Sequence, residues 1–335
     1  MRSATPIARC RAISEGDSMK VVKSSEGLAD EVPSIALAAG FFDGVHLGHR
    51  DILSVTLKRA RATGGEAWAL TFEPHPLAII APERRPKLLT TLDLRLELLA
   101  AAGLDGCMLL PFTMETAALA PASFVQKFLG GWMQRGKTCA VVSGDNWRFG
   151  SKRAGALADI ETLSGGDISV IEVPIVVHAD SRISSSRIRE AISAGELQDA
   201  AAMLGRPHMI RERTAIGTGE GAKLGFATAN ITPRAEVMPP TGGVYEVAVS
   251  RLSHKEEGWM KGVANYGFRP TFPNARPDVA LLEVHILGFQ GDLHGEVLDV
   301  AFVRKLRDEV KFETRGELIR QMKADVQAVK EGVRF

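Results

Sequence analysis

Two histidines in the N-terminal half of this sequence have the spacing of an anion-binding pair. His46 and His49 lie three residues apart in the run Gly-Phe-Phe-Asp-Gly-Val-His-Leu-Gly-His, residues 40–49. On a helical turn this spacing places both imidazoles on one face, where they can hydrogen-bond a triphosphate and stabilise charge on its α-phosphate. Nucleotidyl transfer depends mainly on such positioning, so no covalent nucleophile is required. Taken alone, the motif could also be a metal pair or two surface histidines.

The surroundings of this run favour phosphate binding. It follows an apolar segment, residues 35–39, that is typical of a buried strand, and a helical pattern begins after Gly48. In an open parallel sheet, phosphate ligands bind at such strand-to-helix turns. The amides of the helix N-terminus face the anion, and small residues such as Gly44 and Gly48 allow close backbone approach.

A second polar group lies in the C-terminal half. A glycine-rich segment, residues 217–221, precedes Thr228 and Asn230, which project to the same side of an extended chain. Their hydroxyl and amide oxygens are suitable hard ligands for Mg²⁺ bound to ATP phosphates. The alternative is a turn followed by a strand with two exposed polar residues.

The secondary-structure elements that must position these residues follow two different patterns along the chain. Before Arg206, short apolar strands alternate with helices, which predicts a doubly wound, mostly parallel sheet. After it, shorter alternating runs and turn signals predict an antiparallel β-barrel or sandwich closed by a helix near residues 314–330. The expected strands are residues 35–39, 68–72, 107–110, 139–142, 244–249, 261–265 and 281–286, and the expected helices of the first half include residues 92–102 and 124–133.

The bulk properties exclude several classes of protein. The net charge of +1 gives no general argument for a nucleic-acid partner. The three cysteines have no CxxC pair, so neither a disulfide framework nor a zinc site is indicated. No apolar run reaches the length of a membrane span, and the first residues lack a secretory h-region. We expect a cytoplasmic protein, and Met19 is an alternative start.

The front run resembles the signature of the nucleotidyltransferase superfamily, and further blocks resemble the bacterial bifunctional riboflavin kinase/FAD synthetase family. These blocks are residues 71–76, 89–92, 143–150 and 183–189. The resemblance implies that His46 and His49 are catalytic. It implies ATP contacts from Gly40, Phe42, Asp43, Gly48, Ser184, Ser185, Ser186 and Arg187, and flavin or nucleotide contacts from Asp145, Asn146 and Arg148. Read alone, the serine block could be a helix N-cap, and residues 144–148 an ordinary turn.

The C-terminal half resembles the riboflavin kinase domain, whose hallmark is a Gly-Phe-Pro-Thr-Ala-Asn block. The resemblance implies that Glu283 is the general base for the riboflavin 5′-hydroxyl, although it could be a solvated strand residue. It also implies that Thr228 and Asn230 hold Mg²⁺ and that Arg307 contacts the flavin. The implied ATP contacts of the kinase are Gly217, Gly221, Lys223, Gly225, Thr228 and Asn230.

Together these features predict an α/β + β protein. The expected parts are a disordered extension (residues 1–34), an FMN adenylyltransferase domain (residues 35–205) and a riboflavin kinase barrel with a C-terminal helix (residues 206–335). ATP, riboflavin, FMN and FAD are the implied substrates and products, with Mg²⁺ as the metal. We expect neither nucleic acid nor membrane as partner, and a weak homo-oligomer is left open.

Some residues depart from the family pattern. Phe41 replaces a small polar residue beside the phosphate loop, and Glu212, Ala222, Ala227 and His294 replace the usual Gly, Arg, Pro and Tyr. Phe41 could crowd the nucleotide, and Glu212 would hinder ATP binding if it faced the phosphates. Two alternatives follow: a divergent paralogue with only FMN adenylyltransferase activity, or a non-catalytic flavin or nucleotide sensor.

Overall fold

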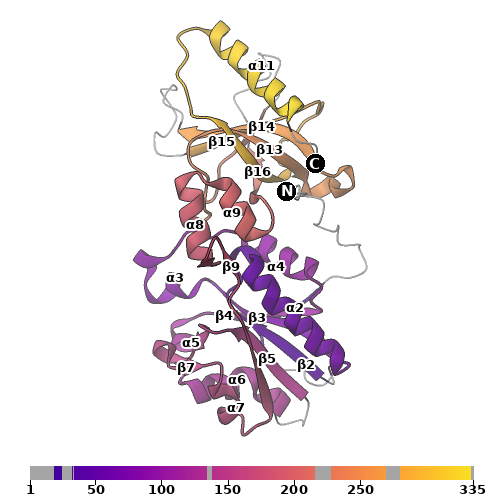
Figure 1. The fold of residues 1–335 in the computed structure, drawn as a ribbon, viewed down its shortest axis with the longest axis vertical. Coiled ribbons are helices and arrows are strands. Elements are labelled where there is room, and N and C mark those ends of the chain that lie inside the picture. Colours follow the sequence, from indigo (N-terminus) through magenta and orange to yellow (C-terminus); the bar gives the residue numbers. More distant parts are fainter. Residues whose placement is uncertain are drawn as a thin grey trace. The chain divides into compact units, whose positions relative to one another are not determined.

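The chain forms two compact units (Figure 1). The computed structural model describes residues 19–24, 32, 34–133, 138–215, 228–268 and 280–332. Among the described residues, the sheet unit contains those from 19 to 86 and Leu92–Ser184, and the barrel unit contains Lys87–Thr91 and those from Ser185 onward. Among the helices that the structure describes, none combines the length and apolarity needed to span a bilayer.

The sheet unit is built on six parallel strands in the order β1-β4-β3-β2-β5-β8. Its central strands β2 and β3 are mostly apolar and buried, because helices cover both faces of such a sheet. The strands are β1 (Lys20–Val22), β2 (Ser34–Ala39), β3 (Glu66–Glu73), β4 (Gly106–Pro111), β5 (Thr138–Gly144) and β8 (Ile168–Val173); the helices are α2 (Leu47–Ala62), α3 (Pro76–Ile80), α4 (Leu92–Ala101), α5 (Met114–Ala118), α6 (Pro121–Met133) and α7 (Asp159–Leu163). The predicted doubly wound fold is confirmed.

The two edge strands of this sheet were not predicted. Residues 20–22, which are expected to lie in a disordered extension, form β1, which pairs in parallel with β4. The expectation of disorder is therefore wrong for these three residues, because the open edge of β4 supplies main-chain partners that no local pattern reveals. At the opposite edge, β8 pairs with β5.

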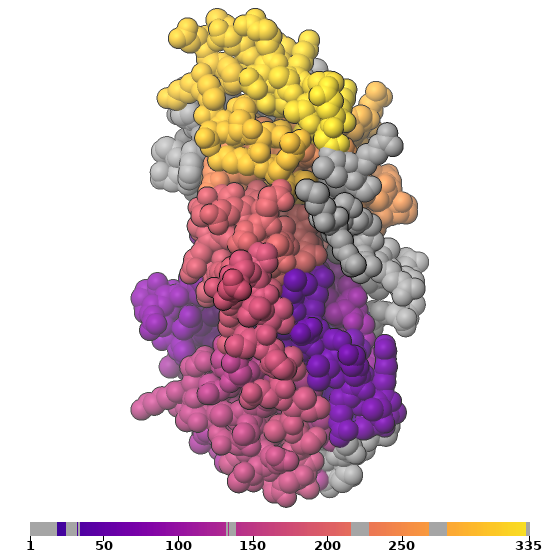
Figure 2. Space-filling model, in the orientation of Figure 1, coloured from indigo at the N-terminus to yellow at the C-terminus, as the bar shows by residue number. Residues whose placement is uncertain are grey.

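The barrel unit contains six antiparallel strands that close in the order β11-β12-β15-β14-β13-β16. They are β11 (His208–Ala215), β12 (Thr228–Ile231), β13 (Gly243–Arg251), β14 (Met260–Phe268), β15 (Ala280–Ile286) and β16 (Val297–Arg307). The helix α11 (Arg315–Glu331) begins at a capping box between Thr314 and Glu317. The expected barrel with a final helix is confirmed, and Figure 2 shows α11, in yellow, on the surface of this unit.

Strand alternation decides which barrel residues face outward. Ile231, Leu282 and Val284 are fully or almost fully buried in the barrel core. Their neighbours in the chain therefore project to the outer face. This alternation places Asn230 and Glu283 outside the barrel wall, on the side where α11 packs against β14.

Two helices and one distant segment complete the barrel unit. α8 (Ser185–Ala194) packs against α9 (Leu197–Leu204), and Leu197 belongs to the barrel core. Leu88 forms a parallel bridge with Val237, and its N–H and C=O bond to Glu236 and Met238. The division into two compact units therefore falls after Ser184. The predicted boundary between the adenylyltransferase and kinase domains, after residue 205, stays a prediction.

Two candidate active sites

The turn after β2 holds the histidine run in an unusual backbone conformation. Phe42, Gly44 and Val45 all have positive φ angles, of 59°, 78° and 40°. The Phe42 ring is fully buried and lies so close to Gly40 that a Cβ there would be 3.0 Å from it. The turn forms the short 3-10 helix η1 (Asp43–Val45) and leads directly into α2. The backbone is therefore shaped to present the N-terminus of α2 at the carboxyl end of β2.

His46 and His49 lie together at that helix N-terminus. His46 is the N-cap residue of α2, and its Nδ1 accepts a hydrogen bond of 3.2 Å from the His49 N–H. The two rings stack with their centroids 3.6 Å apart. Burial, reinforced by the neighbouring His46, lowers the pKa of His49 well below 6.5. His49 is therefore neutral at pH 7, and its buried Nδ1 has no hydrogen-bond partner among the described residues.

The turn after the adjacent strand β5 brings a second set of predicted residues to the same sheet edge. Asp145 forms an ion pair of 3.0 Å with Arg182. Arg148 donates to the backbone carbonyls of Asp145 and Trp147 at 3.1 and 2.8 Å. Asn146 lies in the same turn. Because β2 and β5 are parallel neighbours, this turn and the histidine run share the carboxyl edge of the sheet.

The serine block is divided between the two units. Ser184 ends the sheet unit, whereas Ser185, Ser186 and Arg187 open α8 in the barrel unit. Within the sheet unit, the segment that leads into the block passes the histidine turn: a Cβ at Gly48 would lie 3.9 Å from the Ile183 carbonyl oxygen. ATP contacts by these residues stay predictions.

Sequence reasoning missed Arg95, a buried cation at this edge of the sheet. Arg95 is 2% exposed although it lies on α4, and its Nη2 contacts Glu73 at 2.8 Å. Its guanidinium carbon lies 4.3 Å from the centroid of the Phe41 ring. The available signal was an arginine on an apolar helix face, between Leu94 and Leu98.

The second site lies on the outer face of the barrel. Glu283 of β15 is directly opposite Asn230 of β12 on one side and Asn265 of β14 on the other. Thr228 pairs in the same way with His285. Residues directly opposite each other in a sheet share a face. The structure therefore places Thr228, Asn230 and Glu283 in one polar patch, and their roles in Mg²⁺ binding and catalysis stay predictions.

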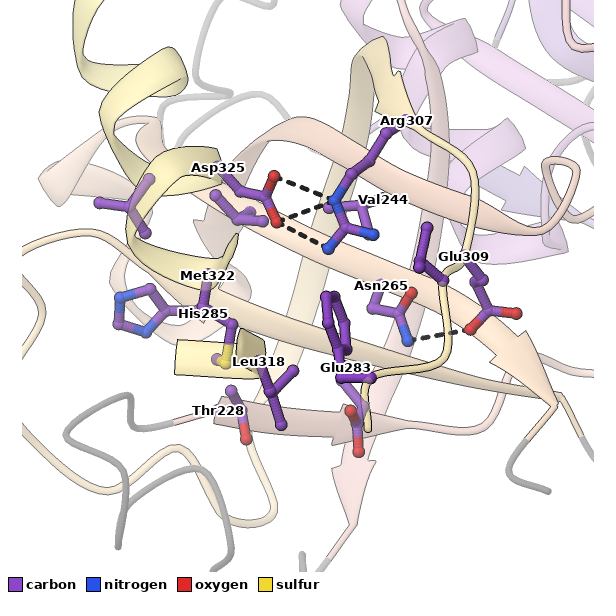
Figure 3. A pocket seen from close by; sticks show the side chains of 14 residues that line it. Thr228, Val244, Asn265, Glu283, His285, Arg307, Glu309, Leu318, Met322 and Asp325 are labelled. Carbon is purple, nitrogen blue, oxygen red and sulfur yellow. Dashed lines mark hydrogen bonds and ion pairs between the residues drawn. The ribbon is translucent and has the colours of Figure 1, made fainter. Parts of the chain in front are cut away.

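A cavity of about 220 Å³ adjoins this patch (Figure 3). Thr228 and Glu283 line one side, and apolar side chains of α11 line another, among them Leu318, Met322 and Val326. The cavity thus combines a carboxylate with an apolar wall. Pockets of this composition are typical of small-molecule sites.

Arg307 also lines the cavity, where it holds α11. Its guanidinium donates to the Asp325 carboxylate, with Nη2–Oδ2 at 2.8 Å, and Asp325 accepts a further bond from Gln321. A second carboxylate, Glu309, accepts from Asn265 at 3.2 Å. Figure 3 shows the Arg307–Asp325 and the Asn265–Glu309 interactions. The predicted flavin contact of Arg307 therefore has to coexist with its ion pair to the helix.

The oxygen donors of the patch fit a hard cation. Thr228 and Asn230 offer a hydroxyl and an amide oxygen on one face, and Mg²⁺ usually adds water and substrate oxygens to few protein ligands. Among the described residues, no group of three His, Cys, Asp or Glu side chains could hold a metal. The predicted ATP contacts Gly217, Gly221, Lys223 and Gly225, and the departures Ala222 and Ala227, lie outside the described residues.

The described departures from the family pattern are accommodated locally. Glu212 pairs with Arg234 at 3.1 Å, and burial raises its pKa. Phe41 packs edge-on against His75, with ring centroids 4.4 Å apart, and against Arg95. His294 is exposed, and its N–H donates to Asp292. The side chains of Glu212 and Phe41 thus have an ion-pairing and a packing role in their own units, whereas the hydrogen bond of His294 comes from its backbone.

Comparisons with known proteins cover nearly the whole chain. The FAD synthetase family matches residues 29–187, and the riboflavin kinase family matches residues 204–333. The bifunctional riboflavin kinase/FMN adenylyltransferase of Listeria monocytogenes is 34% identical over 295 residues, which are 87% of this chain and 90% of that protein. The enzyme of the same name from Escherichia coli K12 is 34% identical over 311 residues, covering 92% and 96%.

A solved structure has the same architecture. The crystal structure described as a macrolide-efflux protein from Streptococcus pneumoniae superposes with a TM-score of 0.78 at 27% sequence identity. The match covers 94% of this chain and 100% of that one. The combination of a parallel-sheet unit and a barrel unit therefore recurs along the full length of a related chain.

Proposed function

The chain belongs to the bifunctional riboflavin kinase/FMN adenylyltransferase family, and from this premise we propose that its two sites carry out the two reactions in turn. The barrel site phosphorylates riboflavin to FMN, and the sheet site adenylylates FMN to FAD. The observation that carries the proposal is that one chain holds two unlike sites: a stacked histidine pair at a strand-to-helix turn and a carboxylate beside a half-apolar cavity.

At the sheet site, a phosphate oxygen of FMN attacks the α-phosphorus of ATP. A new P–O bond forms, the bond between the α-phosphorus and the bridging oxygen breaks, and pyrophosphate leaves. His46 and His49 stabilise the charge on the phosphate oxygens, assisted by the amides of the α2 N-terminus. The lowered pKa of His49 supports a role as a neutral hydrogen-bond donor rather than as a proton source.

At the barrel site, Glu283 accepts the proton of the riboflavin 5′-hydroxyl. The oxygen attacks the γ-phosphorus of ATP, and ADP leaves. Glu283 lies beside the cavity, between Asn230 and Asn265 on the neighbouring strands. This position supports its role as the base, because a base must reach the bound hydroxyl. Thr228 and Asn230 would hold Mg²⁺, which neutralises charge on the transferred phosphoryl group.

The cavity walls support binding of a flavin. An isoalloxazine ring is flat and largely apolar, and the cavity offers Val244, Phe312, Leu318 and Met322. Glu283 and Thr228 stand at the polar side, where a ribityl hydroxyl has to meet ATP. Arg307 would orient the flavin from its fixed position against Asp325.

Two further expectations complete the proposal. We place the enzyme in the cytoplasm, where riboflavin and ATP are available, and leave a weak homo-oligomer as a proposal for sedimentation experiments. The near-neutral net charge of +1 agrees with small-molecule substrates.

Product analysis tests the function. The purified chain is incubated with Mg²⁺ and ATP, and with either riboflavin or FMN, and the flavins are separated by chromatography. We expect FMN and then FAD from riboflavin, and FAD from FMN. Conversion of FMN alone would identify a single-activity adenylyltransferase, and binding without turnover would identify a sensor.

A further inference from the structure

Arg95 ties together the ends of two strands beneath the histidine turn. Its Nη1 donates to the Phe41 carbonyl at 3.3 Å, and its Nη2 donates to the Phe72 carbonyl at 3.2 Å and to Glu73 at 2.8 Å. Phe41 begins the turn after β2, whereas Phe72 and Glu73 end β3. One guanidinium therefore spans two neighbouring strands at the point where both leave the sheet.

The Phe41 residue is held from several directions. Its carbonyl also accepts from the Thr71 hydroxyl at 3.0 Å, and its ring contacts both the Arg95 guanidinium and the His75 ring. In addition, α4 packs against η1, the short helix that precedes His46. Movement of Arg95 would therefore change the start of the segment that ends in the His46/His49 stack.

Burial of this cation needs an explanation beyond folding. Burial lowers the pKa of Arg95, while the nearby carboxylates of Glu73 and Asp43 oppose this shift. Its Nε is buried and has no hydrogen-bond partner among the described residues. A buried charge with an unsatisfied donor costs stability unless its other contacts offset the loss. An apolar residue at this helix position would avoid the buried charge, but it would remove the donors that Arg95 supplies to the Phe72 carbonyl and to Glu73.

We propose that Arg95 is a positioning residue for FMN adenylylation: by fixing Phe41 relative to Glu73, it sets the turn that presents His46 and His49 to the nucleotide. Arg95 touches neither histidine, so its effect is exerted through the backbone of residues 40–46. The inference rests on the proposed adenylyltransferase function of the sheet site.

The test measures both reactions of the full-length chain, so that the barrel reports on general damage. Arg95→Met removes both the charge and the hydrogen bonds. Arg95→Lys keeps a positive charge for the ion pair with Glu73, but its ammonium group lacks the planar set of donors that would also reach the Phe41 carbonyl. We expect kcat for FAD formation to fall about 30- to 100-fold in Arg95→Met, because small misplacements of catalytic groups have effects of this size. In the same variant the KM for ATP changes little and the rate of riboflavin phosphorylation is unchanged. The kcat of Arg95→Lys for FAD formation lies between those of Arg95→Met and the wild type.

Chemical rescue separates positioning from stability. In Arg95→Ala, added methylguanidinium is expected to restore kcat about tenfold towards wild type, whereas methylammonium is not, because only the planar group offers paired donors. An unchanged kcat in Arg95→Met, or an equal loss of both activities without rescue, would overturn the inference. If Arg95→Met does not fold, wild-type kcat in Arg95→Lys overturns it. Absence of FAD formation in the wild-type chain would refute the proposed function instead.

Discussion

The imidazole rings of His46 and His49 stack at an interplanar angle of 17°, with His46 also capping the helix that carries His49. The two rings therefore form one unit, in which loss of either ring changes the position of the other. This relationship leads to a specific expectation about how substitutions at the two positions combine.

His46→Ala and His49→Ala are each expected to lower kcat for FAD formation from FMN about 10²- to 10³-fold, the usual cost of removing one donor to a developing oxyanion. The double variant should lose little more, since groups that act as a unit are not additive. Chromatographic rates of FAD formation check this, with riboflavin phosphorylation as the control. Additive losses in the double variant would show that the rings act independently.

Glu283→Gln is expected to lower riboflavin phosphorylation about 10²- to 10⁴-fold, because the amide cannot accept the hydroxyl proton. Glu309→Gln is the matched control: Glu309 lines the same cavity but is bonded to Asn265. The rate of riboflavin phosphorylation by Glu309→Gln should remain near that of the wild type. FAD formation from FMN should be unaffected in both Glu283→Gln and Glu309→Gln. Equal losses in the two variants would contradict the assignment of Glu283 as the base.

Asp325→Asn is expected to loosen α11. Asp325 is 6% exposed and accepts from Arg307 and Gln321, so its loss leaves a partly buried guanidinium without a counterion. We expect a cost of about 1–3 kcal/mol in the docking of α11, together with a raised KM for riboflavin. Hydrogen exchange in residues 315–331 measures the docking.

The control for this variant is Asp308→Asn, which removes an exposed ion pair with Lys305 near the same strand end. Solvent screening makes such pairs weak, so exchange in α11 should not change. Similar acceleration in both variants would show that any lost charge near β16 loosens the helix, and would remove the special role of Asp325.

His208 should make the barrel sensitive to acid. Its ring is buried and its Nε2 bonds to the Met238 carbonyl at 2.8 Å; burial lowers its pKa to about 4. The unfolded chain takes up a proton near pH 6.5, whereas the folded barrel does so only near pH 4. Stability is therefore fully present above pH 6.5 and falls by roughly 3 kcal/mol as the pH drops through this window.

Hydrogen exchange of β11 and β16 at pH 6.5 and 4.5, corrected for intrinsic rates, measures this loss. His208→Gln keeps a donor for the Met238 carbonyl but does not titrate, so its pH dependence should be weaker. The same slope in both proteins would assign the acid sensitivity to other groups.

Sequence patterns predicted the helices and strands that are specified by short-range patterns of apolar and polar residues. The central strands β2 to β5 of the sheet, the alternating strands β13 to β15 and the helix α11 all appear where their periodicity placed them. The shared side of Thr228 and Asn230 also followed from strand alternation, whereas Glu283 was assigned to the same site through the family resemblance. These features depend on short-range patterns, which the chain displays directly.

Features that depend on distant partners were missed. β1 forms because the edge of β4 is open to a pairing strand, and the sequence of Lys20–Val22 does not indicate this distant partner. Arg95 has its partners Phe41 and Glu73 at sequence separations of 54 and 22 residues. Likewise, the expectation that Glu212 would hinder ATP binding if it faced the phosphates did not foresee its ion pair with Arg234, 22 residues away.

The bridge between Leu88 and Val237 limits how the chain can be divided. Because the barrel unit takes in Lys87–Thr91, no single cut separates the two units without removing part of one. A fragment that starts at Ser185 leaves the Glu236 carbonyl and the Met238 amide without the backbone partners that Leu88 supplies. A fragment that starts at Ser185 therefore lacks a segment of its own unit, and a peptide with the sequence of residues 87–91 is expected to stabilise it when supplied in trans.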